Sequence, residues 1–82
     1  MSFIYVIYSD KFKRFYVGIA DNMESRLKCH NFGKVKSTKA FMPWRVVHLE
    51  ELNNKQEARL REKYLKSAAG RRWRKNNIIT GD

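Results

Sequence analysis

Residues 15–30 read FYVGIADNMESRLKCH, and the expected fold is arranged around this segment. Phe15 to Ile19 are mostly β-branched or aromatic, the residue types that fill a pleated strand. Asp21 or Asn22 can then cap a helix through a side-chain oxygen. The segment therefore predicts a strand that turns into a helix running from about residue 22 to residue 31.

The predicted helix has two useful faces. Met23 and Leu27 lie four residues apart and are expected to face the sheet. Arg26 and His30, at the same spacing, share a neighbouring face. Gly33 suits the left-handed residue that follows a helix. The segment thus brings a cation and an imidazole side by side.

A second apolar run precedes this segment. Residues 3–8 read FIYVIY, which predicts a strand. Polar turn formers at residues 9–14 join it to residues 15–19, so the two runs predict a hairpin. For Tyr5 and Tyr16 to face one cleft, an odd-numbered residue must lie opposite an even-numbered one.

A third strand is expected after a Pro-Trp pair. Residues 45–52 read RVVHLEEL, and their side chains should alternate between two faces. The expected faces are Val47, Leu49 and Glu51 on one side, and Val46, His48 and Glu50 on the other. His48 is expected to be structural and not a metal ligand.

The strongest helix pattern covers residues 55–69. Gly70 is expected to end this helix. Residues 71–77 then predict a short basic helix that Trp73 holds against the body of the protein.

The longer helix has one broad apolar arc, in which Glu57 and Arg61 are spaced to pair. Glu62 falls at the edge of the arc, where a carboxylate can line a cleft. The members of the arc are Ala58, Leu60, Tyr64, Leu65, Ala68 and Ala69.

Length and cysteine content limit the class of protein. The chain has 82 residues, which predicts one domain over residues 1–82. Its single cysteine, Cys29, cannot form an internal disulfide and is expected to be an ordinary thiol in a reducing cytoplasm. The sequence contains no apolar run of about 18 residues and no signal peptide, so no membrane span is expected.

The chain is strongly basic. Eighteen Lys and Arg against eight Asp and Glu give a formal net charge of +10, a field that attracts polyanions such as nucleic acid. The loop at residues 33–40 either holds phosphates or is a solvated surface. The expected nucleic-acid-binding residues are Lys34, Lys36, Lys39, Arg71, Arg72 and Arg74. A ribosome-associated or membrane-surface protein would show the same balance, so charge predicts a class of partner and no activity.

Two tyrosines, an arginine, a histidine and a later carboxylate form a set that can cut a phosphodiester bond. Arg26 offers a planar cation for phosphate, and Tyr5, Tyr16 or His30 can pass protons. Glu62 offers an oxygen ligand for Mg²⁺. Composition alone favours a plainer alternative, in which the tyrosines pack in strands and the charged side chains lie on solvated faces. The spacing favours the nuclease hypothesis.

That spacing starts with Phe3-Ile4-Tyr5 and continues with Tyr16-Val17-Gly18, Arg26, His30 and a helix that contains Glu62. It resembles the GIY-YIG nuclease superfamily over nearly the whole chain, most of all the small stand-alone members grouped with the N-terminal incision domain of the repair subunit UvrC. The resemblance implies an α+β fold with a three-stranded antiparallel sheet flanked by helices. The order of elements predicted above agrees with it.

The resemblance also implies roles at single positions. Tyr5 and Tyr16 match the two motif tyrosines, and Gly18 matches the motif glycine. Arg26 matches the catalytic arginine, and Glu62 matches the metal-binding glutamate. Glu57 is the rival to Glu62, although the helical wheel places it in the packed arc.

Other positions match less closely. His30 matches a histidine of some members. Phe3 replaces the first glycine of the family name, and Val17 replaces an isoleucine. Asn76 and Asn77 are candidates for a late asparagine. The candidate catalytic residues are therefore Tyr5, Tyr16, Arg26, His30 and Glu62, with Glu62 as the metal ligand.

These observations lead to one principal hypothesis. The protein is expected to be a DNA endonuclease that uses Mg²⁺ or Mn²⁺ and acts in repair or recombination. Branched or flapped DNA, or a protein partner, would supply its specificity. The alternative is a basic nucleic-acid-binding module whose site has lost activity, and a third reading is an interaction protein that uses the fold as a scaffold.

Overall fold

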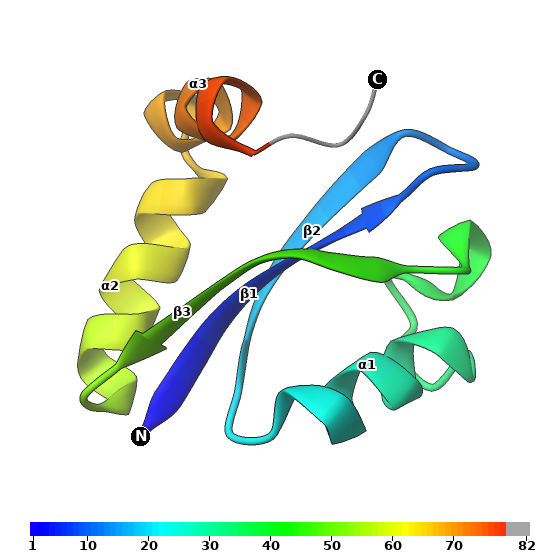
Figure 1. The fold of residues 1–82 in the computed structure, drawn as a ribbon, viewed down its shortest axis with the longest axis horizontal. Helices are drawn as coiled ribbons and strands as arrows, with labels where there is room; N and C mark the ends of the chain where they lie inside the picture. Colours follow the sequence, from blue (N-terminus) through cyan, green and yellow to red (C-terminus); the bar gives the residue numbers. More distant parts are fainter. Residues whose placement is uncertain (79–82) are drawn as a thin grey trace.

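The computed structural model describes residues 1–78, which form an α+β fold with the predicted three-stranded antiparallel sheet (Figure 1). The strand order is β2-β1-β3, so β1 is central. None of the helices in the described part of the chain combines the length and hydropathy needed to cross a bilayer. The elements are β1 (Ser2–Ser9), β2 (Arg14–Ala20), α1 (Met23–Asn31), the 3-10 helix η1 (Lys39–Phe41), β3 (Arg45–Leu52), α2 (Lys55–Lys66) and α3 (Ala68–Asn77).

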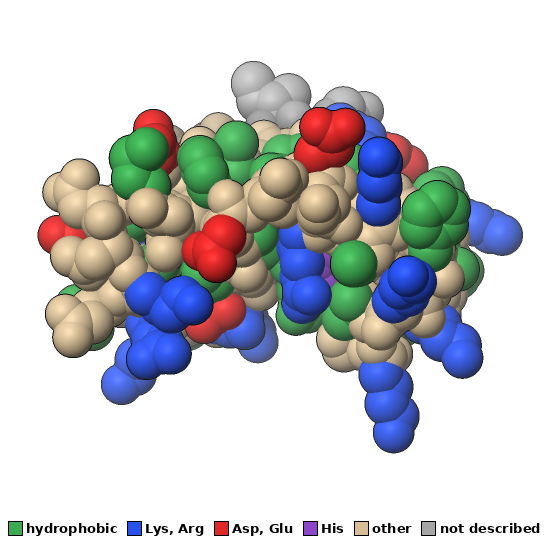
Figure 2. Space-filling model, turned by 90° about the horizontal axis from the view of Figure 1, so that it is seen from below, with side chains coloured by type: hydrophobic (Ala, Val, Ile, Leu, Met, Phe, Trp, Pro, Cys, Tyr) green, Lys and Arg blue, Asp and Glu red, His purple; other side chains and the backbone are tan. Residues whose placement is uncertain are grey.

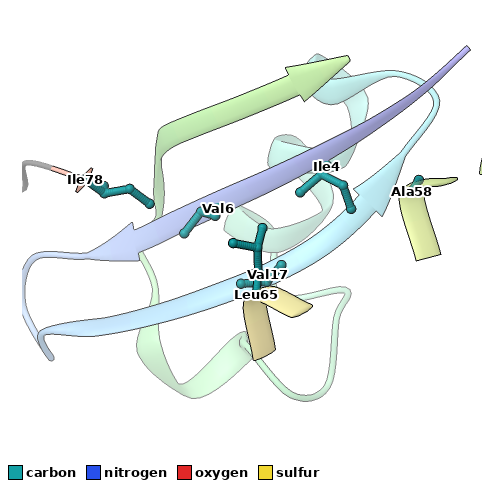
Figure 3. Close-up of a cluster of buried hydrophobic side chains, with 6 residues drawn as sticks. All are labelled: Ile4, Val6, Val17, Ala58, Leu65 and Ile78. Atoms are coloured by element: carbon teal, nitrogen blue, oxygen red, sulfur yellow. The ribbon is translucent and has the colours of Figure 1, made fainter. Parts of the chain in front are cut away.

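The central strand is buried on both faces, which explains why residues 3–8, between its terminal serines, are all β-branched or aromatic. Ile4 and Val6 point toward α2 and α3, where they join Val17 and Leu65 in one core cluster (Figure 3). The odd-numbered side chains of β1, such as Tyr5, point to the other face of the sheet, which α1 covers (Figure 1). The sheet therefore separates an aliphatic core from an aromatic one.

The register of the hairpin confirms the condition set by the two tyrosines. Tyr5 lies opposite Gly18, and Ile7 lies opposite Tyr16, so odd-numbered residues face even-numbered ones. Residues that are paired across an antiparallel sheet project to the same face. Tyr5 and Tyr16 therefore both project toward α1.

A register shift interrupts the pairing of β3 with β1. Val6 lies opposite His48, whereas the next residue, Ile7, lies opposite Val46, so Val47 is an extra residue. Such a bulge ends simple alternation. Val46 packs on the α1 side, whereas His48 lies against α3. The prediction that Val46 and His48 share a face is wrong because of this bulge.

The bulge also separates Val47 from Leu49. Val47 packs in the core on the α2 side, whereas Leu49 lies opposite Tyr5 and so belongs to the α1 side. Glu50 pairs with Arg61 of α2 and shares the face of His48, as predicted.

Helix α1 begins and ends as its sequence predicts. The side chain of Asn22 accepts a hydrogen bond from the backbone N–H of Ser25, which caps the first turn. Met23 and Leu27 pack toward the sheet. After the helix, Gly33 adopts a φ of 73°, a conformation in which a Cβ atom would be strained.

The boundary between the last two helices differs from the prediction. Helix α2 ends at Lys66, and Ser67 is both its C-cap and the N-cap of α3. Gly70 therefore lies in the first turn of α3 and ends no helix. A Cβ atom at Gly70 would lie 2.5 Å from the Cα atom of Leu65, so the glycine allows the two helices to meet closely. Trp73 packs on the core beyond it, as expected.

The buried stripe of α2 is narrower than predicted. Ala58 and Leu65 are buried, but Leu60 is 71% exposed and Tyr64 is also exposed. The helix packs against β2 and β1 at one end of the sheet, and only a narrow strip of its surface reaches the core.

The predicted pairing of Glu57 with Arg61 is also wrong. Arg61 turns toward β3 and bonds both oxygens of Glu50, at 2.9 and 3.0 Å. Glu57 is left exposed at the first turn of α2, with its carboxylate near the N–H of Asn53.

Candidate active site

The hydroxyl of Tyr5 lies at the centre of a buried polar cluster on the α1 face of the sheet. It is 2.8 Å from Nε2 of His30 and 3.3 Å from Nε of Arg26, which donates to it. The sequence predicted that Arg26 and His30 would share a face of α1, and the structure brings both onto one tyrosine oxygen. A strand and a helix thus supply the cluster together.

The hairpin makes room for the Tyr5 ring. Gly18 lies opposite Tyr5, and a Cβ atom there would be 2.5 Å from Cζ of the ring. Because no real side chain approaches a ring this closely, only glycine at this position lets the ring lie against β2. The backbone of β2 at Gly18 therefore sets how closely the Tyr5 ring lies against β2.

Tyr16 lies at the outer side of the same cluster. Its ring centroid is 5.1 Å from that of His30 and 6.3 Å from that of Tyr5. Lys66 of α2 lies over the ring, with Nζ 5.9 Å from the centroid. Tyr16 is half-buried, so it forms the border between the buried cluster and the end of α2.

His30 is buried and neutral at pH 7. Burial, together with the nearby charge of Arg26, lowers the pKa of its imidazole to about 4. Its second ring nitrogen, Nδ1, lies 2.8 Å from Oγ1 of Thr38. A neutral imidazole has one nitrogen that accepts a proton, as a proton relay requires.

Burial and the nearby Arg26 shift the pKa of the Tyr5 hydroxyl in opposite directions. Burial raises the pKa of the Tyr5 hydroxyl above its ordinary value, and the hydrogen bond and charge of Arg26 offset part of this rise. The same bond raises the pKa of Arg26, which therefore stays cationic. The resting site holds a protonated tyrosine beside a permanent positive charge.

Thr38 is a member of the cluster that the sequence did not reveal. The predicted loop at residues 33–40 is partly ordered into turns and η1, and Thr38 is fully buried within it. Nε1 of Trp44 donates to the Thr38 carbonyl at 2.9 Å. Asn31 in turn bonds the backbone N–H and carbonyl of Trp44, at 2.6 and 3.0 Å. No periodicity marks Thr38, so no pattern in the chain distinguishes it from the exposed Ser37 beside it.

Glu62 approaches the cluster from α2. Its side chain is 27% exposed, and its carboxylate lies 3.4 Å from Nζ of Lys66. The charge of Glu62 reaches Tyr5, where it raises the pKa of the hydroxyl. The carboxylate therefore lies at the border of the buried stripe, as predicted, and on the side of the tyrosines.

Glu62 is a single carboxylate at the edge of the cluster, the kind of ligand that a hydrated divalent ion can use. Residues 1–78 contain no group of three or more His, Cys, Asp and Glu side chains that could hold a metal ion. Mg²⁺ commonly keeps several waters and needs only one or two carboxylates. Glu62 can be such a single ligand, provided that Lys66 gives up its contact.

The other candidates for this site lie elsewhere. Glu57 is exposed at the opposite end of α2, near Asn53. Asn77 uses its amide to cap the Trp73 carbonyl within α3, at 2.8 Å, and Asn76 is exposed on the same helix.

The expected phosphate-binding cations fall into two groups on different elements. Lys34, Lys36 and Lys39 are exposed on the segment that follows α1. Arg71 and Arg72 are exposed on α3, across the sheet (Figure 1). Lys and Arg side chains also project along most of the face seen in Figure 2, with acidic side chains among them. On this face the positive charge is therefore spread over several parts of the surface.

Arg74 differs from the other members of its group. It is half-buried, with its guanidinium 5.3 Å from the centroid of the Phe15 ring. Burial and the neighbouring Arg71 lower its pKa. Its packing makes it a less accessible contact for a polyanion than Arg71 or Arg72.

A second polar cluster lies beneath α3 and stabilises the packing of the helices on β3. His48 bonds Glu50 at 2.7 Å, and its ring lies 5.2 Å from the ring of Trp73. Arg61 holds the same carboxylate and lies over the Trp73 ring. The polar groups here neutralise one another and hold α2 and α3 on β3, in keeping with the expected structural role of His48.

The geometry of the first cluster suits general acid–base chemistry on an anionic substrate. It combines a tyrosine hydroxyl, a neutral imidazole that can take a proton, and a guanidinium that stays charged. A carboxylate suited to a hard cation lies at its edge. Enzymes that cleave phosphate esters need these functions within reach of one another.

Comparison with known proteins agrees with the fold. The family model described as the GIY-YIG catalytic domain matches residues 1–77. A relative, UPF0213 protein CPE1444 of Clostridium perfringens, is 37% identical over 67 residues, which cover 80% of this chain and 71% of that protein. No solved structure matches the chain. The family match and this relative show that the chain belongs to the GIY-YIG family, which is of nuclease type.

Proposed function

We propose that this protein is a DNA endonuclease that hydrolyses phosphodiester bonds with the help of a divalent metal ion. The observation that carries the proposal is the Tyr5 hydroxyl held between Nε2 of His30 at 2.8 Å and Nε of Arg26 at 3.3 Å. A buried tyrosine between a neutral base and a cation is suited to proton transfer beside an anion.

Arg26 binds the scissile phosphate in this proposal. Its Nε–H group donates to Tyr5, so its terminal nitrogens are the ones that would bind the phosphate. A planar guanidinium suits the oxygens of phosphate, and its fixed charge stabilises the additional charge of the transition state.

Tyr5 and His30 move the proton. An O–H bond of the attacking water breaks and its proton passes to the Tyr5 oxygen, while the proton of Tyr5 passes to Nε2 of His30. The water oxygen forms a bond to phosphorus, and the bond from phosphorus to the leaving oxygen breaks with its electron pair on that oxygen, which then takes a proton from solvent. Tyr16, beside both rings, helps to position the water.

Glu62 would hold the metal ion, with Mg²⁺ or Mn²⁺ as the natural candidates. The ion supplies positive charge to the scissile phosphate when bound. Lys66 neutralises the Glu62 carboxylate until then, at 3.4 Å.

DNA is the proposed substrate because of the family and the charge of +10. Lys34, Lys36 and Lys39 follow the helix that carries Arg26, so they are the proposed contacts to flanking phosphates. The other proposed contacts, Arg71, Arg72 and Arg74, would bind a more distant part of the substrate. We further propose that the substrate is a branched or flapped structure of repair or recombination, selected by its shape or by a protein partner.

A second candidate function is a DNA-binding module of low or no activity. Two features favour it: Glu62 is paired with Lys66, and residues 1–78 contain no group of three metal-ligating side chains. Such a protein would bind DNA through the same cations and leave it intact.

Cleavage assays on defined DNA decide between the two. The purified chain is incubated with nicked, flapped, branched and linear duplexes, with and without Mg²⁺ or Mn²⁺. Glu62→Ala and Arg26→Ala are assayed beside it, with Glu57→Ala as the matched control because Glu57 is an exposed carboxylate on the same helix. The endonuclease proposal expects metal-dependent cleavage that Glu57→Ala retains and the other two variants lose.

Two other outcomes have clear meanings. Binding without cleavage of any substrate in either metal favours the DNA-binding module. Cleavage that survives both Glu62→Ala and Arg26→Ala contradicts the proposed site.

A further inference from the structure

The hydrogen bonds on one side of His30 have only one consistent direction. The Nε–H group of Arg26 donates a hydrogen bond to the Tyr5 oxygen. Within residues 1–78 the only other partner of this hydroxyl is Nε2 of His30, at 2.8 Å. If Nε2 carried a proton, the buried hydroxyl of Tyr5 would have no acceptor among these residues, which is costly. The Tyr5 hydroxyl must therefore donate to Nε2.

The hydrogen bonds on the other side of His30 lead to the same state. Oγ1 of Thr38 lies 3.3 Å from the carbonyl oxygen of Val35, which can only accept, so Thr38 donates its proton there. Oγ1 lies 2.8 Å from Nδ1 of His30 and must then accept from it. Both sides of the ring thus favour the proton on Nδ1 and a lone pair on Nε2.

We propose that Thr38 is a positioning residue that holds His30 in the Nδ1–H tautomer, so that Nε2 is open to the proton of Tyr5. The inference rests on the proposed function, since it names what sets the direction of proton transfer in that site. When the O–H bond of Tyr5 breaks, the N–H bond at Nε2 forms, and Thr38 accepts a stronger hydrogen bond from Nδ1 of the resulting imidazolium. Thr38 is fully buried, so its part is to orient His30 and not to contact the substrate.

The segment after α1 is built to hold this threonine. The backbone N–H of Thr38 donates to the Val35 carbonyl at 3.1 Å, which forms the turn. Trp44, which is buried, donates to the Thr38 carbonyl, and Asn31 at the end of α1 fixes the backbone of Trp44. Helix α1 supplies His30. Through Asn31 and Trp44, the same helix also fixes Thr38, the residue that orients His30.

The tautomer can be measured directly by NMR. In a long-range ¹H–¹⁵N spectrum of the full chain at pH 7, a protonated and an unprotonated imidazole nitrogen differ greatly in ¹⁵N shift. The proposal expects Nε2 of His30 to appear unprotonated and Nδ1 protonated. A wild-type spectrum with the proton on Nε2 overturns the proposal, whatever the variants do.

Three variants then test the part of Thr38. Thr38→Val keeps the shape and removes the hydroxyl, Thr38→Ser keeps the hydroxyl, and Ser37→Ala is the matched control because Ser37 is the exposed hydroxyl next in the chain. Thr38→Val is expected to shift His30 toward the other tautomer or a mixture of the two. Thr38→Ser and Ser37→Ala are expected to keep the wild-type pattern. An unchanged Nδ1–H tautomer in a folded Thr38→Val overturns the proposal, and so does its loss in Thr38→Ser.

Cleavage kinetics provide a second readout. Thr38→Val is expected to lower kcat by about tenfold or more with little change in KM, as is usual when a partner that orients a histidine is removed. Thr38→Ser should restore most of the rate. If the wild-type chain cleaves no DNA, the proposed function fails, whereas the NMR result still decides whether Thr38 sets the tautomer.

Discussion

Tyr5 lies opposite Gly18 in the hairpin, and its ring fills the space that a side chain at Gly18 would occupy. Glycine here is required by a side chain on the neighbouring strand. The tyrosine oxygen reaches both Arg26 and His30 only because the ring lies this close to β2. The cluster is thus sensitive to one methyl group at a position that takes no part in the chemistry.

Replacement of Gly18 by alanine is therefore expected to displace the Tyr5 ring. The added Cβ atom would be 2.5 Å from Cζ of the ring, and overpacking of this kind costs about 1–3 kcal/mol of unfolding free energy. We expect urea denaturation to show this loss and cleavage to fall to background. Ile19→Val, one residue along the same strand, should retain cleavage. A Gly18→Ala variant with the wild-type rate would show that the ring position is not important.

Arg26 is expected to act through its geometry and not only through its charge. Arg26→Gln and Lys28→Gln each remove one positive charge from α1, and Lys28 is an exposed residue paired with Glu24. Loss of a group that stabilises transition-state charge lowers kcat by roughly 10²–10³-fold, which is the effect expected for Arg26→Gln. Lys28→Gln should change kcat little. Similar losses in both variants would mean that α1 contributes only a general field.

The free energy of unfolding should decrease as the pH is lowered, because of His30. Its pKa is lowered from 6.5 to about 4 in the folded chain, so between these values the unfolded chain binds a proton that the folded chain does not. The stabilisation is present above pH 6.5 and is lost as the pH falls toward 4, which amounts to about 2 kcal/mol between pH 7 and pH 5. Urea denaturation at several pH values measures it. His30→Gln should lose most of this dependence, whereas His48→Gln should keep it, and a His30→Gln variant with the wild-type profile would contradict this assignment.

Arg61 is expected to stabilise the fold from outside the active site. It holds the Glu50 carboxylate at 2.9 Å in a region where both side chains are mostly buried, and its charge lowers the pKa of Glu50, against the effect of burial. Arg61→Ala would leave a mostly buried carboxylate with His48 as its remaining partner among residues 1–78, at a cost of about 1–3 kcal/mol. Arg59→Ala, on the exposed side of the same helix, should stay within about 0.5 kcal/mol of wild type. Thermal unfolding of the two variants compares them, and equal stabilities would contradict the role given to Arg61.

The elements of the fold could be predicted because their signals are local. The strands of the hairpin are apolar on both faces because a core cluster lies on each face of the sheet, and Asn22 and Gly33 mark the ends of α1. Two boundaries could not be predicted. The bulge at Val47 depends on how β3 pairs with a distant strand, and the break at Ser67 depends on the close contact of Gly70 with Leu65. In both cases tertiary packing overrides a regular local pattern.

The candidate site was predictable to a different depth at each residue. The shared face of Arg26 and His30 follows from helical spacing, whereas the register that puts Tyr5 and Tyr16 on one face was a condition that the structure had to meet. Thr38 has no such signal, since a buried hydroxyl and an exposed one look alike in a polar segment. The partner of Arg61 was likewise misjudged, because a residue on β3 lies closer to it than the residue one turn away on its own helix.

The most direct test of the proposed site is the single-turnover cleavage rate of Tyr5→Phe with Mg²⁺ or Mn²⁺. The substitution removes one oxygen atom, the one that His30 and Arg26 share. Tyr64→Phe is the matched control because Tyr64 is an exposed tyrosine on α2. We expect Tyr5→Phe to remain folded and to lose cleavage by at least about 10²-fold, with Tyr64→Phe at the wild-type rate. Cleavage by Tyr5→Phe at the wild-type rate would contradict a mechanism that passes the proton of water through Tyr5.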